Sequence, residues 1–143
     1  MRFELERALF AGDIGVKDLP DAWRERYRNL LGIVPENDAT GVLQDVHWSG
    51  AAFGYFPSYT LGNLYAASLG KAMQRDLPAM WDEVGRGDFR SILGWLRTNV
   101  HSRAHIDDAP ALIQRVCGET DPVEDLLDYL WSRYGSLAGK SRP

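Results

Sequence analysis

Residues 57–75 read PSYTLGNLYAASLGKAMQR and predict a long helix. Pro57 or Ser58 is expected to begin this helix, because proline at the first helical position loses no backbone hydrogen bond. The helix is expected to continue to about Arg75. Apolar residues recur along it at helical spacing, and they are Leu61, Leu64, Tyr65 and Leu69. One apolar side on a long helix indicates a protein in which helices pack on one another.

The remainder of the chain divides into shorter helices at glycine, proline and aspartate residues. These signals predict helices over residues 2–11, 19–31, 78–85, 88–100 and 108–117, and a last one from residue 121 onward. Gly12 and Gly32 end the first two, since glycine suits the left-handed residue after a last turn. No stretch alternates with a period of two, so strands are not expected. The prediction is an all-α fold with a single domain over residues 1–143.

Composition narrows the possible functions. Hydrophobic residues make up 45% and charged residues 25% of the 143 residues, which is typical of a globular protein. The net charge of -4 argues against nucleic-acid binding, which needs a dense basic face. Cys117 is the single cysteine, which excludes a disulfide framework and is compatible with a reducing cytoplasm. The start, MRFELERALF, has no apolar signal core and no stretch could span a membrane, so we expect a cytoplasmic protein without membrane contact.

The least regular stretch is 39–56, ATGVLQDVHWSGAAFGYF, which is typical of a loop that carries function. Within it, residues 41–48 read GVLQDVHW. This octapeptide resembles the Gly-x-x-Gln-Asp-x-His-Trp signature of the carboxypeptidase Taq family. The segments RFELERALFAGDIGVKDLPDAW, SGAAFGYFPSYTLGNLYA and CGETDP are also similar to that family, so the resemblance covers nearly the whole chain. Gln44 and Trp48 are expected to shape the loop.

The resemblance implies the C-terminal part of a zincin-like, all-helical metallocarboxypeptidase with a deep substrate groove. In that family a divalent metal such as zinc or cobalt assists hydrolysis of the last peptide bond. A His-Glu-x-x-His helix and a later Glu supply its ligands and the general base. Neither element occurs in this sequence, so we expect no metal site and no cofactor in this chain. The resemblance therefore implies one wall of the groove, as in a truncated or split carboxypeptidase that is inactive alone.

The resemblance also implies roles for residues in and after the signature. His47 and Tyr59 are twelve positions apart, a spacing similar to that of the substrate-binding His and transition-state Tyr of related helical zinc peptidases. Tyr59 would then donate to the carbonyl oxygen as it gains charge, and removing such a donor typically costs about 3 kcal/mol. His47 would donate to the substrate backbone. Tyr55 would line the groove, and Asp45 would either orient His47 or cap a nearby helix.

Simpler interpretations of these residues stay open. His47 beside Trp48 could be a packed loop histidine, and Tyr59 could pack its ring and bond its hydroxyl to backbone. His101 and His105 are four positions apart, which on a helix would place both imidazoles on one face, as in some metal sites. However, Ser102 stands where a catalytic base would be, so a solvated helix end is the favoured interpretation.

Two functions compete at this point. The first is the groove wall of a metallocarboxypeptidase, with a partner chain carrying the metal site and a peptide substrate bound only by the complete enzyme. The second is a small helical interaction module that self-associates. Apolar surface that would pack against the other helices of a complete enzyme has to be covered, because large exposed apolar patches are rare on monomers. A homo-oligomer, most simply a dimer, is therefore expected. A third hypothesis, metal binding by His101 and His105, is weaker.

Overall fold

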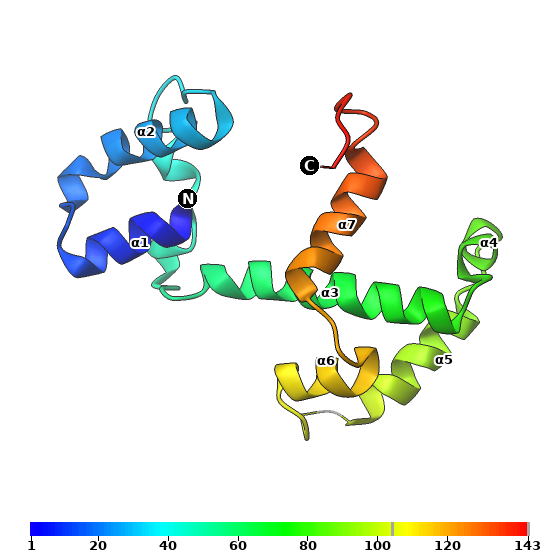
Figure 1. Ribbon diagram of the computed structural model, residues 1–143. Helices are drawn as coiled ribbons and strands as arrows, with labels where there is room; N and C mark the ends of the chain where they lie inside the picture. Colours follow the sequence, from blue (N-terminus) through cyan, green and yellow to red (C-terminus); the bar gives the residue numbers. More distant parts are fainter. Residues whose placement is uncertain (104, 143) are drawn as a thin grey trace. The chain divides into compact units, whose positions relative to one another are not determined.

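The computed structural model describes residues 1–103 and 105–142, and in these residues it contains seven α-helices and no strand. The predicted all-α fold is confirmed. The chain forms two compact units, an N-terminal unit of Met1–Thr60 and a C-terminal unit of Leu61–Pro143. Figure 1 follows the helices of both units along the chain. No helix in the described residues is both long enough and apolar enough to cross a membrane.

Two helices form the core of the N-terminal unit. Helix α1 (Arg2–Ala11) and helix α2 (Leu19–Leu31) are joined through a 3₁₀ turn, η1 (Val16–Asp18). Gly12 and Gly32 follow the two helices with φ of 79° and 69°, the left-handed conformation expected of them. The buried core residues are Leu5, Leu19 and Trp23. Leu30 and Leu31, at the end of α2, are exposed.

The loop that follows α2 contains two more 3₁₀ turns, η2 (Val42–Gln44) and η3 (Trp48–Gly50). It leads into α3 (Phe56–Asp76), which begins one or two residues before the predicted helix and ends one residue after it. The irregular segment predicted from sequence is thus a series of tight turns. The indole ring of Trp48, in η3, packs edge-on against Trp23 with ring centroids 6.2 Å apart. The loop is therefore attached to the α1–α2 core.

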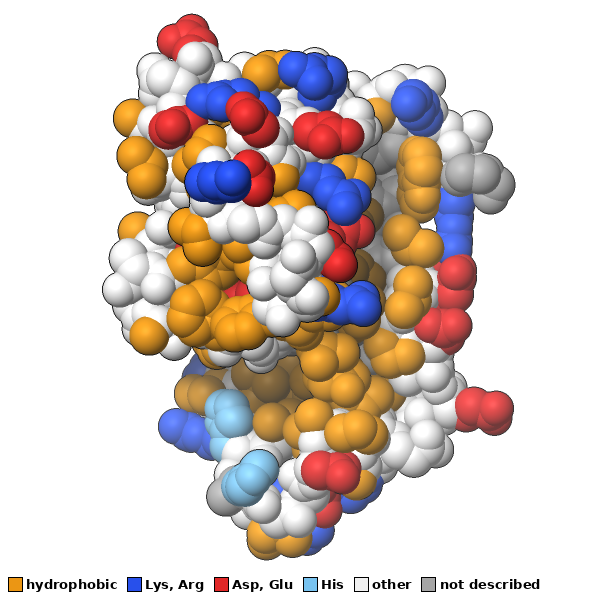
Figure 2. All heavy atoms as spheres, turned by 90° about the vertical axis from the view of Figure 1, so that its left-hand side faces the viewer, with side chains coloured by type: hydrophobic (Ala, Val, Ile, Leu, Met, Phe, Trp, Pro, Cys, Tyr) orange, Lys and Arg blue, Asp and Glu red, His pale blue; other side chains and the backbone are white. Residues whose placement is uncertain are grey.

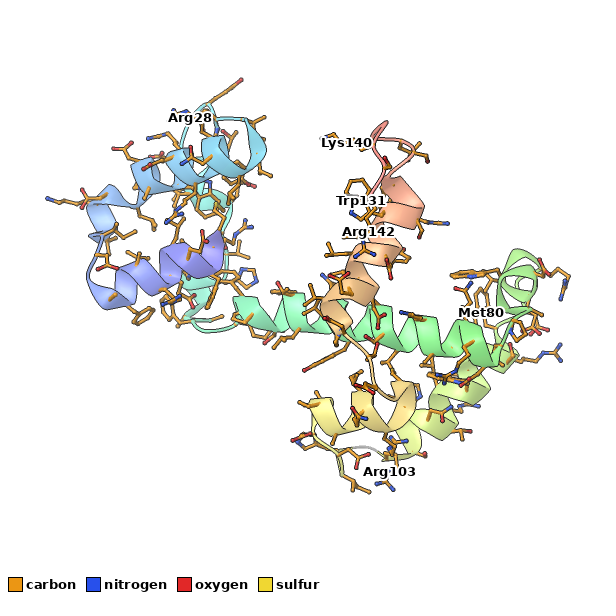
Figure 3. All side chains as sticks on the ribbon, viewed as in Figure 1. Arg28, Met80, Arg103, Trp131, Lys140 and Arg142 are labelled. Carbon is orange, nitrogen blue, oxygen red and sulfur yellow. The ribbon has the colours of Figure 1, made fainter. Side chains whose placement is uncertain are left out.

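The C-terminal unit consists of the later part of α3 and four further helices. These are α4 (Met80–Gly85), α5 (Arg90–Asn99), α6 (Ala109–Cys117) and α7 (Pro122–Tyr134). The buried residues of its core are Ala72, Met73, Met80 and Trp95, and Figure 3 labels Met80 at the start of α4. Asp108 and Asp121, where the sequence predicted these helices to begin, cap α6 and α7 through their carboxylates.

The buried side of α3 matches the predicted apolar stripe only in part, since Leu69 packs against the core of the C-terminal unit. Leu61 is 47% exposed, whereas Ser68 is only 1% exposed and Ala72, one turn later, is also buried. A serine lies inside because its hydroxyl donates to Asp125 of α7 at 2.7 Å, which satisfies both polar groups.

Figure 3 shows Arg142 beside α7, where it pairs with Glu124 and Asp128.

Candidate functional site

The signature begins at a tightly packed glycine, Gly41. A Cβ atom on Gly41 would lie 3.0 Å from the backbone oxygen of Asn37 and 3.2 Å from the Cβ of Pro35. Gly41 thus lies close to the preceding turn, and η2 begins at the next residue, Val42. Gln44 ends η2 and donates a side-chain hydrogen bond to the backbone oxygen of Ala39. These contacts fix the first half of the loop, which is the shaping role expected of Gln44.

Asp45 is fully enclosed and holds the second half of the loop. Its Oδ1 atom accepts hydrogen bonds from the backbone N–H groups of His47 at 2.9 Å and of Trp48 at 3.2 Å. Its Oδ2 atom lies 2.7 Å from Nε of Arg2 and 3.5 Å from Nδ1 of His47. The side chain of Asp45 is 0% exposed. Asp45 therefore contacts both the start of η3 and the imidazole of His47.

His47 and Tyr59 are in direct contact. Nε2 of His47 lies 3.2 Å from the hydroxyl oxygen of Tyr59, at a hydrogen-bonding distance. Tyr59 is in the first turn of α3, and its position twelve residues after His47 brings the two side chains together. Tyr59 is 53% exposed, so its hydroxyl remains open to a second partner.

Two further aromatic rings complete a cluster around the imidazole, which we call the His47 cluster: His47, Tyr55, Phe56 and Tyr59. The ring of Tyr55 is stacked on His47 at 6.3 Å and meets Tyr59 edge-on at 5.1 Å. Phe56 contacts His47 edge-on at 5.0 Å and is buried. Tyr55 is half exposed. The cluster thus presents an imidazole and two phenol rings at the surface of the N-terminal unit, over a buried phenylalanine.

Two charged residues of the site were not identified from sequence. Arg2 contacts Asp45, and Glu6 accepts hydrogen bonds from the indole Nε1 of Trp48 at 2.9 Å and from the backbone N–H of Gly54 at 2.6 Å. Glu6 is only 5% exposed. Arg2 and Glu6 are four residues apart on α1 and so share one side of that helix. The sequence spacing of Arg2 and Glu6 indicates that they share a side of α1, but it does not indicate which loop packs against that side.

The residues present do not fit a catalytic metal ion. In the described ranges, 1–103 and 105–142, no three His, Cys, Asp or Glu side chains are grouped closely enough to hold one. His47 directs its two nitrogen atoms toward Asp45 and Tyr59. His101 lies in the 3₁₀ turn η4 (His101–Arg103) and His105 in a turn, so neither lies in an α-helix. The helical arrangement considered for this histidine pair is therefore wrong.

Comparisons with known proteins identify relatives over nearly the whole chain. The family model described as carboxypeptidase Taq (M32) metallopeptidase matches residues 1–134. This match places the all-α chain among relatives of metallopeptidases. The chain belongs to the carboxypeptidase Taq (M32) metallopeptidase family, which confirms the resemblance found in the signature.

Individual relatives agree with this assignment. Thermostable carboxypeptidase 1 of Thermus thermophilus is 43% identical over 97% of this chain, and carboxypeptidase 1 of Bacillus subtilis is 44% identical over 96%. A crystal structure of BsuCP matches 95% of the chain with a TM-score of 0.89 at 44% identity. The M32 carboxypeptidase from Deinococcus radiodurans R1 matches 96% with a TM-score of 0.85 at 39% identity. The chain spans only 27% of the length of both curated relatives and 27% and 28% of the two solved chains.

Proposed function

We propose that this chain forms one wall of the substrate groove of a metallocarboxypeptidase. The observation that carries the proposal is the contact of 3.2 Å between His47 and the exposed hydroxyl of Tyr59. In this proposal Tyr59 donates to the carbonyl oxygen of the last peptide bond, and His47 binds the substrate backbone. Tyr55 lines the groove beside them, since its ring contacts both side chains.

Tyrosine suits the role of a donor to a developing oxyanion. Its hydroxyl donates a hydrogen bond without carrying charge, and its ring restricts where that hydroxyl lies. The cluster supports this use because buried Phe56 and enclosed Asp45 hold His47 from two sides, whereas Tyr59 stays half exposed. Asp45 is proposed to orient His47, because its Oδ2 atom faces Nδ1 of the imidazole.

The metal ligands of this proposed enzyme are supplied by residues outside the 143-residue sequence, either in the same polypeptide or in a partner chain. The family relationship and the unsuitable donor set in the described residues together support this. By itself, the chain is proposed to be inactive on peptides. A carboxypeptidase assay of the isolated chain with added zinc or cobalt is expected to release no C-terminal amino acids.

A chimera tests the groove-wall proposal directly. The part of carboxypeptidase 1 of Bacillus subtilis that aligns with this chain is replaced by residues 1–143, and release of C-terminal amino acids is measured. We expect the chimera to hydrolyse peptides, because the two segments are 44% identical. A folded chimera that binds its metal but releases no amino acid would argue against the proposal.

A second candidate function is a helical interaction module that self-associates. A groove of about 950 Å³ supports it, formed within the C-terminal unit by α3, α4 and α7. Apolar side chains in its lining include Ala66, Met80, Trp81, Leu126 and Leu130. Figure 2, which views the chain from the left-hand side of Figure 1, shows hydrophobic side chains at the surface on that face as well. We propose a second copy of the chain as the occupant, giving a dimer, and a cytoplasmic location in keeping with the single thiol of Cys117.

A further inference from the structure

Three enclosed polar atoms converge behind His47. They are Nε of Arg2, Oδ2 of Asp45 and Nδ1 of His47, and Oδ2 lies 2.7 Å from the first nitrogen and 3.5 Å from the second. All three atoms are shielded from solvent, and none has an aligned hydrogen bond within the described residues. Such groups are costly to enclose unless opposite charges face one another. Here the guanidinium of Arg2 supplies the charge that compensates Asp45.

Arg2 is held in this position by more than its ion pair. Its guanidinium carbon lies 5.0 Å from the centre of the Trp23 ring, a cation–π contact with a buried core residue. It stands at the first residue of α1, whose packing against α2 fixes where the side chain begins. The charge beside Asp45 is therefore positioned by the core of the N-terminal unit.

The two oxygen atoms of Asp45 have different tasks. Oδ1 is occupied by the backbone N–H groups of His47 and Trp48. Oδ2 is left for Arg2 and for the imidazole. An ionised carboxylate only accepts hydrogen bonds, so the atom that faces Nδ1 of His47 is an acceptor. A neutral imidazole has one N–H and one acceptor nitrogen, and its proton is then expected on Nδ1.

This assignment determines the direction of the next hydrogen bond. With the proton on Nδ1, Nε2 carries the lone pair and accepts from the hydroxyl of Tyr59 at 3.2 Å. The hydroxyl proton of Tyr59 then points at His47, and an incoming carbonyl oxygen has to replace His47 as its acceptor. With the opposite tautomer, His47 would donate to Tyr59 and leave the hydroxyl proton free.

We propose that Arg2 is a positioning residue which, through Asp45, keeps neutral His47 in its Nδ1–H tautomer and so directs the Tyr59 hydroxyl proton toward Nε2. The effect on a substrate carbonyl oxygen rests on the proposed groove function. The tautomer of His47 is independent of that function. Arg2 acts by holding the enclosed carboxylate in place, with its Oδ2 atom facing the imidazole. Without the guanidinium, an uncompensated charge would be left beside the imidazole.

The test is nitrogen NMR of the full chain, in a buffer well above the pKa of free histidine, about 6.5. The two ring nitrogens of His47, assigned with a His47→Gln variant, report directly which one carries the proton. The wild-type protein is expected to show Nδ1–H, the tautomer that free histidine disfavours in water. The substitution Arg2→Gln is expected to abolish this single-tautomer signature, and Arg2→Lys, which keeps a positive charge, to retain it.

Arg26→Gln is the matched control, because Arg26 is an arginine of the same unit whose ion pair is with Glu4 at 3.4 Å. It is expected to leave the His47 spectrum unchanged. An Nε2–H tautomer in the wild-type protein would overturn the proposal, whatever the variants do. An unchanged tautomer in a folded Arg2→Gln variant would also overturn it, and would leave Arg2 a packing residue for Trp23. Neither result depends on peptide hydrolysis, so failure of the groove proposal would be seen separately, in the chimera assay.

Discussion

The carboxylate of Glu6 in α1 accepts a hydrogen bond of 2.9 Å from the indole of Trp48, forty-two positions later in the chain. The second oxygen of the same carboxylate accepts from the backbone N–H of Gly54 at 2.6 Å. One side chain thus ties both ends of the segment 48–54 to the first helix. Because that segment lies between His47 and Tyr59, Glu6 contributes to the geometry that brings these two residues together.

Substituting Glu6→Gln is expected to destabilise the N-terminal unit. Glutamine offers one acceptor oxygen, so its NH₂ group would face one of the two N–H donors, and a buried donor would lose its partner. A loss of about 2 kcal/mol in the free energy of unfolding is expected. Urea denaturation followed by tryptophan fluorescence measures it. Glu4→Gln is the control, since Glu4 is half exposed and pairs with Arg26 over 3.4 Å; equal losses in the two variants would contradict the role of Glu6.

Local signals were sufficient to predict most helices of this fold. Gly12 and Gly32 take left-handed φ angles, and Asp108 and Asp121 accept from the first turns of their helices, all within a few residues in sequence. Such signals act through the backbone next to them and do not depend on the remainder of the fold. The structure also brings His47 into contact with Tyr59, which the spacing of twelve positions did not by itself predict.

Contacts between distant segments were not predictable in the same way. The apolar spacing of α3 suggested that Leu61 would be covered, but the buried position is Ser68, whose partner Asp125 lies fifty-seven residues later. Arg2 and Glu6 have the appearance of ordinary surface charges of an amphipathic helix. Their contacts depend on a loop that begins about forty residues farther along the chain. Helical periodicity defines the sides of a helix and leaves open what each side contacts.

Asp125 is expected to make the stability of the C-terminal unit depend on pH. Burial alone raises the pKa of its carboxyl, but hydrogen bonds from Lys71, Thr120 and Ser68 outweigh burial and lower the pKa below its ordinary value. A lowered folded-state pKa means that the unfolded chain binds the proton more readily. The stabilisation is therefore present above the unfolded pKa of about 3.9 and is lost as the pH falls through the lower folded value.

The substitution Asp125→Asn tests this linkage. At neutral pH it is expected to lower the free energy of unfolding by about 2 kcal/mol, because charge-assisted hydrogen bonds are lost. The difference from the wild type should shrink as the pH falls below about 4. Denaturant titrations at several pH values measure both effects. Asp128→Asn, on the same helix but half exposed, should cost less than 1 kcal/mol, roughly the value of a surface ion pair. A pH-independent difference for Asp125→Asn would argue against this assignment.

Cys117 is expected to react slowly with thiol reagents. Burial raises the pKa of its thiol, and the negative charge of Asp125 raises it further. The thiolate is the reactive form, so less of it is present at neutral pH than in a free cysteine. Alkylation by iodoacetamide should be slower in the folded protein than in the same chain unfolded in urea, and mass spectrometry measures both rates. Equal rates would show that the environment at the end of α6 does not suppress ionisation.

The proposed dimer places apolar side chains of the C-terminal groove in an interface. Leu130→Glu introduces a charge into this interface. Burying a leucine side chain contributes about 1.5–3 kcal/mol to the free energy of association, so its loss would weaken dimerisation roughly tenfold or more. Light scattering at micromolar concentration is expected to show a dimer for the wild type and a larger monomer fraction for this variant. Leu137→Glu, at a residue 82% exposed outside the groove lining, should leave the dimer intact. A monomeric wild-type protein would exclude the second copy as occupant.

Tyr59 offers the most direct test of the proposed groove wall. In the chimera with the Bacillus subtilis relative, Tyr59→Phe removes only the hydroxyl and keeps the ring that contacts His47 and Tyr55. If this hydroxyl stabilises the carbonyl oxygen in the transition state, kcat should fall by about 100- to 1,000-fold, the usual effect of losing one oxyanion donor. KM should change much less, because the interaction strengthens only as charge develops on that oxygen. Tyr134→Phe removes an exposed hydroxyl at the end of α7 and should leave both constants unchanged. A Tyr59→Phe chimera with the kcat of its parent would mean that the contact between Tyr59 and His47 serves packing, and that the oxyanion donor belongs to another residue.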